Sequence, residues 1–283
     1  MSIKTIKHLA FILKLNAEEL LHLSTIVDNF YYTKSEPKLD KNNNPKIKNG
    51  KQLFRTLNPS TKELKEIQSR IQKNILSKIE LPDYAYGAVK GRDNVKNALK
   101  HRGKKYNFTT DLSNYFPTIS NKQVYQMFVS NNFSPTVARI LTKLTTYNGK
   151  LPQGAPTSPT ISNLVFVKTG LKLKSVADSH NITFTSFIDD LTFSSKIDFK
   201  DIIPKLIQII LEDNFIISHQ KTYYKTYRPT VTGVIVTNNY LFLTEKFKEK
   251  LSNLTDKTPE QISGLKNYAL KIKRANTIKN KPN

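Results

Sequence analysis

Apolar residues recur along the chain at two spacings, one typical of helices and the other typical of strands. Intervals of three and four residues predict an amphipathic helix from four apolar positions, Leu64, Ile67, Ile71 and Ile75. Residues 6–34, 161–177, 198–213 and 243–254 also have helical character. Short runs rich in β-branched and aromatic residues predict strands within 106–111, 182–195, 215–225 and 230–239. Helices and strands mixed along one chain indicate an α+β fold with a sheet at its centre.

Short polar signatures predict where several of these elements begin. Capping boxes pair a polar residue with Glu or Gln three positions later, and this spacing occurs at Asn16 with Glu19 and at Ser60 with Glu63. Ser120 or Asn121 predicts another helix start, and Ser134–Pro135 predicts one with proline in the first turn. The pair Asn49–Gly50 predicts a hairpin turn between "PKIK" and "KQLFRTL".

The charge of the chain narrows the class of partner. Its 283 residues carry 45 basic and 22 acidic side chains, for a net charge of +23. Such an excess favours a polyanion such as nucleic acid, although lysine that is merely solvated would give the same composition. The absence of cysteine excludes disulfides and thiolate metal sites and favours a reducing cytosol. No apolar run approaches the length of a membrane span, so we expect a cytoplasmic protein with no membrane partner.

The segment "FIDDLTFSS" places Asp189 and Asp190 side by side at the tip of a predicted hairpin. Asp111 ends another strand-like run, "YNFTTD". If that strand pairs with the one over 182–188, the three carboxylates converge at one sheet edge, where they repel each other without a cation. Mg²⁺ suits such an oxygen-rich cluster, and two ions can activate a hydroxyl and stabilise a leaving pyrophosphate. A solvated Asp-Asp turn is the simpler alternative.

A second segment favours the metal site over the solvated turn. In "LPQGAPTSPTISNL", glycine and proline form a rigid loop that leads into a helix, which allows the backbone to approach a ligand closely. A proline-rich surface turn would not explain the amide of Gln153 directly before Gly154.

The chain resembles the reverse transcriptases, because "DLSNYF", "LPQGAPTSP" and "FIDDLTFSS" have the order and spacing of their palm motifs. More narrowly it resembles the bacterial retron reverse transcriptases, through "NALKH", "VTG" and the finger-like "RTLNPSTKELKEIQ". The resemblance covers roughly residues 17–270. It implies a right-hand polymerase fold of fingers, palm with antiparallel sheet and short helical thumb. The expected divisions are an N-terminal helical segment (1–35), fingers (36–105), palm with interleaved finger elements (106–240), and thumb with a polar tail (241–283).

The resemblance also implies roles for individual residues. The metal site is expected at Asp111, Leu112, Asp189 and Asp190, with Lys221 as proton donor to the pyrophosphate. The incoming nucleotide is expected to contact several residues, with Phe116 as the gate against a ribose 2′-hydroxyl and the basic residues near the triphosphate: Arg55, Lys90, Arg92, Phe116, Gln153, Gly154 and Ala155. The two retron signatures are expected to recognise RNA through Asn97, His101, Val231, Thr232 and Gly233.

For the whole protein the resemblance implies an RNA-directed DNA polymerase that uses two Mg²⁺ ions, with Mn²⁺ as a possible substitute. It would copy a cognate structured noncoding RNA from dNTPs, priming at an internal guanosine 2′-hydroxyl to give branched RNA–DNA (msDNA). A separate effector protein and a role in anti-phage defence are implied too. Two departures are Ile188, where the family usually has alanine, and the short thumb. The alternatives are a group II intron-like or abortive-infection reverse transcriptase, and a noncatalytic RNA-binding scaffold.

Overall fold

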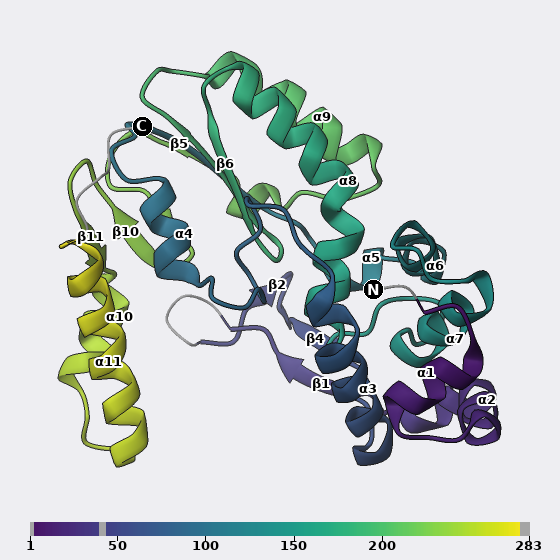
Figure 1. Cartoon of the computed structure of the whole chain (residues 1–283). Helices are drawn as coiled ribbons and strands as arrows, with labels where there is room; N and C mark the ends of the chain where they lie inside the picture. The colour runs from purple at the N-terminus through teal and green to yellow at the C-terminus, as the bar shows by residue number, and fades with distance from the viewer. Residues whose placement is uncertain (1–2, 40–43, 278–283) are drawn as a thin grey trace. The chain divides into compact units, whose positions relative to one another are not determined.

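A computed structural model describes residues 3–39 and 44–277, so the polar tail from residue 278 lies outside the described residues. The chain divides into two compact units that each combine separate stretches of sequence. The first unit comprises Met1–Leu81 and Asn114–Phe166, and the second comprises Pro82–Ser113 and Val167–Asn283. Figure 1 labels their helices and strands. Within the described ranges, no helix is both long and apolar enough to cross a membrane.

The first unit is mainly helical. Its helices are α1 (Ile6–Leu13), α2 (Ala17–Ile26), α3 (Lys62–Asn74), α5 (Tyr115–Thr118), α6 (Asn121–Ser130), α7 (Pro135–Thr145) and the 3₁₀ turns η1 (Val27–Phe30) and η2 (Leu76–Lys78). Two small antiparallel ribbons accompany them, β1 (Lys34–Pro37) with β4 (Phe54–Leu57), and β2 (Ile47–Lys48) with β3 (Lys51–Gln52). The predicted stripe of α3 is confirmed as core, since Leu64, Ile67, Ile71 and Ile75 are all buried.

Most of the predicted helix starts in this unit are confirmed, and one is wrong. Asn16 and Glu19 form a complete capping box at α2. The capping box predicted at Ser60 does not form, because Thr61 is the N-cap of α3. The Ser60 hydroxyl instead donates a 2.8 Å hydrogen bond to the buried side chain of Gln68. Burial therefore gives Ser60 a tertiary partner in place of the local one.

The second unit contains the central antiparallel sheet. Its four strands lie in the order β6 (Thr183–Phe187), β7 (Asp190–Ser195), β5 (Tyr106–Asp111) and β8 (Tyr223–Lys225). A three-stranded sheet consists of β9 (Thr230–Val231), β10 (Val234–Val236) and β11 (Leu241–Leu243). The helices are α4 (Asn94–Lys100), α9 (Ile203–Glu212), α10 (Glu245–Ser252), α11 (Pro259–Ala275), the 3₁₀ turns η3 (Lys200–Ile202) and η4 (His219–Lys221), and the C-terminal part of α8, which as a whole runs over Ser158–Ser179.

Three strand predictions need correction. Strand β5 pairs with β7 and β8, not with the first arm of the hairpin, because β7 lies between β5 and β6. Of the strand expected over 215–225, only Tyr223–Lys225 forms a strand, β8, because the 3₁₀ turn η4 interrupts the segment. The strand expected over 230–239 is a hairpin, β9 and β10, which turns at Thr232 and Gly233.

The two faces of the central sheet differ in chemistry. On one face Phe193 stacks on Phe184 with ring centroids 4.7 Å apart and lies 5.8 Å from Phe108. Because side chains alternate along a strand, Asn107, Thr109 and Asp111 project from the opposite face. The aromatic face anchors the sheet in the core, and the polar face carries the chemistry described below.

Candidate active site

Strand pairing brings the predicted carboxylates together in the second unit. Asp111, the last residue of β5, lies directly opposite Asp190, the first residue of β7. Asp189 precedes Asp190 in the turn between β6 and β7, and its carbonyl accepts a 2.9 Å hydrogen bond from the Leu112 amide. The Asp111 carbonyl accepts a 2.8 Å hydrogen bond from the Ser218 amide. Backbone bonds on both sides therefore hold the three carboxylates at one end of the sheet.

The turn that presents these carboxylates is strained. Phe187 pairs with Asp190, so Ile188 and Asp189 form a two-residue hairpin turn. Ile188 has a φ of 59°, a conformation that suits glycine and is rare for a β-branched residue. Gly87 lies against this turn so closely that an added Cβ would be 2.6 Å from Ile188 Cγ1 and 2.7 Å from the Ile188 nitrogen. The strained turn thus packs directly on a residue that has no side chain.

The electrostatics agree with a cation-binding cluster. Burial, together with the neighbouring charges of Asp189 and Asp111, raises the pKa of Asp190 from 3.8 to about 6. Burial and Asp111 raise the pKa of Asp189 as well. Partial burial alone would lower the pKa of Lys221, but the hydrogen bond to Asp111 and the three carboxylate charges outweigh it and raise this pKa. The cluster therefore disfavours its own charge and attracts a positive group.

The donor set fits a divalent metal ion, although the carboxylates are not arranged around one. Lys221 Nζ donates a 2.6 Å hydrogen bond to Asp111 Oδ2, so an ammonium group already neutralises part of the cluster. Among the residues that the structure describes, no three His, Cys, Asp or Glu side chains are arranged to hold a metal ion as they stand. Carboxylate oxygens are the ligands that Mg²⁺ prefers, and Asp111, Asp189 and Asp190 would hold such an ion.

The predicted nucleotide contacts of the first unit gather around one loop. The Gln153 carbonyl accepts a 2.8 Å hydrogen bond from the amide of Asn58, which follows the strand that carries Arg55. Gly154 has a φ of 114° and approaches Pro59, while Ala155 is buried. Arg55 itself is exposed and lies 3.4 Å from Glu36.

Phe116 lies on α5 and is half-buried, with its ring centroid 5.8 Å from that of Tyr115. Its carbonyl accepts a 3.1 Å hydrogen bond from the Ile119 amide, and the Ile119 carbonyl accepts one of 2.9 Å from Leu151 at the start of the same loop.

The two basic residues expected near the triphosphate from the second unit differ from each other. Lys90 is exposed in a turn. The Arg92 guanidinium donates to the carbonyls of Pro82 at 2.5 Å and Ala85 at 2.6 Å. Arg92 therefore holds the 82–85 segment in place, and its predicted contact with the triphosphate stays a prediction.

The retron signature "NALKH" lies on α4 and is largely buried. Asn97 is 1% exposed and His101 is 0% exposed. The His101 ring lies 2.6 Å from the Ser194 hydroxyl on β7 and 2.7 Å from the Thr185 hydroxyl on β6. Asn97 does not cap this helix, because Asp93 is the N-cap of α4. These two side chains face protein, so the direct RNA contact expected of them does not fit the structure.

The second signature, "VTG", contacts the first. Thr232 and Gly233 form the two-residue turn between β9 and β10, with φ values of 44° and 83°, and Val231 is core. Asn97 Nδ2 donates to the Thr232 hydroxyl at 3.2 Å, and Asn94 Nδ2 donates to the Thr232 carbonyl at 3.1 Å. Helix α4 therefore ties the β9–β10 hairpin to the strands that carry the carboxylates.

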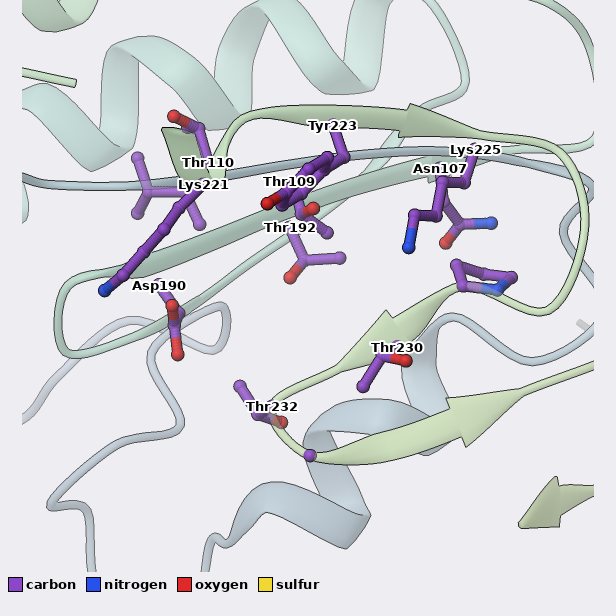
Figure 2. A pocket seen from close by; sticks show the side chains of 13 residues that line it. Asn107, Thr109, Thr110, Asp190, Thr192, Lys221, Tyr223, Lys225, Thr230 and Thr232 are labelled. Carbon is purple, nitrogen blue, oxygen red and sulfur yellow. The ribbon is translucent and has the colours of Figure 1, made fainter. Parts of the chain in front are cut away.

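Beside the carboxylates the structure shows a cavity that sequence reasoning missed. It has a volume of about 270 Å³ and lies between the polar face of the central sheet and the β9–β10 hairpin (Figure 2). Its lining includes Asp190 and Lys221 as well as Asn107, Thr109, Thr192 and Lys225. The alternation in "YNFTTD" and "DLTFSS" is the signal that could have indicated it, because every second residue of both strands is polar.

Comparison with known proteins identifies the chain. Residues 40–249 match the family described as reverse transcriptase (RNA-dependent DNA polymerase). The chain therefore belongs to the reverse transcriptase family. Within that family it is of the retron type, as its sequence motifs predicted, because its relatives are retron reverse transcriptases. The mixed helix and antiparallel sheet agree with the α+β reverse transcriptase fold.

Two of these relatives are the retron Ec86 reverse transcriptase of Escherichia coli and the retron Se72 reverse transcriptase of Salmonella heidelberg. The first is 30% identical over 202 residues, which cover 69% of this chain and 63% of that protein. The second is 39% identical over 135 residues, which cover 47% of this chain and 36% of that protein. The chain thus spans less than two thirds of either relative. A foamy viral protease-reverse transcriptase solved with double-stranded DNA aligns with a TM-score of 0.49 at 22% identity, covering 87% of this chain and 38% of that one.

Proposed function

We propose that the chain is an RNA-directed DNA polymerase whose catalytic centre is the carboxylate cluster of the second unit. The observation that carries this proposal is the cross-strand pair Asp111–Asp190 beside Asp189 in its strained turn. The noncatalytic scaffold is disfavoured, because a scaffold has no need for a cluster in which burial and neighbouring carboxylates raise the pKa of Asp189 and of Asp190.

The roles that we propose for these residues are those that the family resemblance implies. Asp111, Asp189 and Asp190 would hold divalent metal ions, with the carbonyl of Leu112 as a further oxygen ligand. When bound, such ions activate the attacking hydroxyl and stabilise the leaving pyrophosphate. Lys221 forms an ion pair with Asp111, and we propose that its ammonium group gives a proton to the pyrophosphate. Mg²⁺ is the expected metal, in two sites, with Mn²⁺ as a substitute.

Substrate binding is proposed for the residues that the family resemblance implies. Arg55, Gln153, Gly154 and Ala155 would contact the incoming dNTP, and Phe116 would exclude a ribose 2′-hydroxyl. Lys90 would add charge near the triphosphate. For the RNA signatures we propose an indirect role: Asn97 holds the β9–β10 hairpin and His101 fixes α4 to β6 and β7. The exposed Gly233 and the half-buried Thr232 of the hairpin would then face the nucleic acid. The predicted fingers, palm and thumb remain part of this proposal.

The retron resemblance extends the proposal to the whole protein. We infer that it copies a cognate noncoding RNA in the bacterial cytoplasm, primes from an internal guanosine 2′-hydroxyl, and yields branched RNA–DNA. A separate effector protein and a role in anti-phage defence belong to the same proposal. Support comes from the two signatures, which contact each other, and from the retron relatives.

The test is primer extension on an RNA template with Mg²⁺ and dNTPs. Asp189→Asn and Asp190→Asn should each lower extension by more than ~100-fold, since loss of even an outer partner of a metal ligand costs 10–100-fold. RNA binding, followed by fluorescence anisotropy, should persist. Asp178→Asn is the matched control, because Asp178 is an exposed carboxylate that pairs with Lys174. Extension that survives in both variants would refute the catalytic assignment.

A further inference from the structure

The sheet face that carries Asp111 and Asp190 is polar well beyond these two residues. Asn107 and Thr109 on β5 and Thr192 on β7 share that face, because side chains alternate along each strand. Asn107 is only 1% exposed and Thr192 only 2% exposed. Buried sheet faces are ordinarily apolar, since burying a polar group is costly unless it is hydrogen-bonded. A buried, polar face beside a catalytic centre therefore needs a reason.

The cavity of about 270 Å³ lies against this face (Figure 2). Asp190 and Lys221 lie toward one end of it, and Asn107 and Lys225 lie toward the other (Figure 2). Asn107 is four residues from Asp111 along β5, so roughly 13 Å separate the two positions at the usual rise of a strand. The cavity thus extends away from the carboxylates along the sheet.

Asn107 is the informative residue of this lining. Its Nδ2 donates a 3.1 Å hydrogen bond to the Lys104 carbonyl, which fixes the orientation of the amide. Its Oδ1 is buried and has no hydrogen-bond partner among the described residues. In Figure 2 this oxygen points into the cavity. Such an unpaired acceptor beside a cavity can take a donor from a ligand, and a hydroxyl group is such a donor.

Lys225 supplies the complementary charge. It lies opposite Asn107 in the pairing of β5 with β8, and its Nζ lies 5.2 Å from the centre of the Tyr223 ring. In the described part of the chain no carboxylate forms an ion pair with it. The cavity therefore presents an acceptor for a hydroxyl group, Asn107 Oδ1, next to the positive charge of Lys225. A ligand that carries both a hydroxyl group and a negative charge would match this pair.

We propose that this cavity binds one ribonucleotide unit of an RNA strand that leads to the carboxylates. The 2′-hydroxyl donates to Asn107 Oδ1, and an adjacent phosphate pairs with Lys225. Deoxyribose lacks the donor and leaves Asn107 unpaired, so the site distinguishes RNA from DNA. This proposal rests on the proposed function, because it takes the nucleic acid of a reverse transcriptase as the ligand.

The test measures binding of RNA and DNA oligonucleotides of one sequence by fluorescence anisotropy without divalent ions, so that no catalysis is needed. Asn107→Leu keeps the volume and removes the acceptor, and should lower the preference for RNA over DNA by about tenfold, the effect of one buried hydrogen bond. Lys225→Gln should weaken both ligands equally. Asn267→Leu, an exposed asparagine on α11, is the matched control and should leave the preference unchanged. An unchanged preference in an Asn107→Leu variant that melts like the parent would overturn the proposal.

A second measurement uses the unaltered protein and so does not depend on the folding of any variant. An RNA oligonucleotide is replaced by deoxyribonucleotides one position at a time. One position should weaken binding by about tenfold, and a flat scan would overturn the proposal. If that single position is found but the protein extends no primer, the polymerase assignment fails while the ribonucleotide site stands.

Discussion

The complete burial of the His101 ring predicts how the stability of the folded protein changes with pH. Its two nitrogens contact the hydroxyls of Ser194 and Thr185, so it joins α4 to both arms of the hairpin that carries the carboxylates. Burial, with a smaller effect of the Lys104 charge, lowers the pKa of His101 from 6.5 to about 3. The folded protein therefore holds a neutral ring at pH values where the unfolded chain binds a proton.

The sign and size of the effect follow from this difference. Because the folded pKa lies below the unfolded one, the contribution of His101 is complete above pH 6.5 and is lost as the pH falls toward 3. At pH 5 the loss is about 2 kcal/mol, from about 1.5 pH units at 1.36 kcal/mol each. If the chain unfolds cooperatively, this corresponds to a fall in Tm of roughly 4–8 °C.

Urea unfolding at pH 7.5 and pH 5 would measure the effect in the wild type and in His101→Gln. The variant should be less stable at pH 7.5 by about 1–3 kcal/mol, because one of the two hydroxyls loses its partner. The gap should then shrink by about 2 kcal/mol at pH 5. The raised pKa values of Asp189 and Asp190 act in the opposite direction, but they are present in both proteins and cancel. His22→Gln, at an exposed site on α2, is the control, and an equal gap at both pH values would refute the reasoning.

Three further predictions concern activity. Phe116→Val should raise ribonucleotide incorporation relative to deoxynucleotide incorporation in single-nucleotide assays, and an unchanged ratio would remove Phe116 from the gate. Gly87→Ala should lower kcat by about 100-fold while RNA binding persists, because the added Cβ would displace the catalytic turn and misplacement by 1 Å can cost that much. Gly264→Ala is the control and should be neutral, because a Cβ at position 264 has open space. Equal effects of the two substitutions would contradict this prediction. Asn97→Ala should impair self-primed synthesis on the cognate RNA more than extension of an annealed DNA primer, and equal loss would indicate a general folding defect.

Local patterns were sufficient to predict most elements of the fold. The stripe of α3, the capping box of α2 and the hairpin at Asn49–Gly50 depend on neighbours within a few residues, and all three are confirmed. The capping box predicted at Ser60 was wrong, because the Ser60 hydroxyl bonds to the buried side chain of Gln68 instead of capping the helix. The predicted pairing of β5 with the first arm of the hairpin was wrong. Tertiary packing decides the order of strands in a sheet, and the alternation of residues within one strand does not reveal that order.

The candidate site divides in the same way. The convergence of Asp111 with Asp190 was predictable from strand ends, whereas their exact pairing was not. Arg92 was a candidate to contact the triphosphate, and its hydrogen bonds to two backbone carbonyls are a feature that no side-chain pattern reveals. The contact between Asn97 and Thr232 joins residues 135 positions apart, so two signatures that look independent in sequence form one structural unit.

The same reasoning explains how the chain accommodates isoleucine at position 188, where the family resemblance implies alanine. A β-branched residue at a φ of 59° is costly and persists only when its surroundings hold it. Here the backbone of the 84–86 segment bonds to β6, with Tyr86 donating to the Ser186 carbonyl and Ser186 donating to the Tyr84 carbonyl. That pairing seats Gly87 against the turn, where the missing Cβ leaves room for the Ile188 side chain. Because Ile188 Cγ1 is only one of the atoms that a Cβ at Gly87 would meet, Ile188→Ala should rescue Gly87→Ala in part, and full or absent rescue would show that the side chain and the backbone do not share the contact.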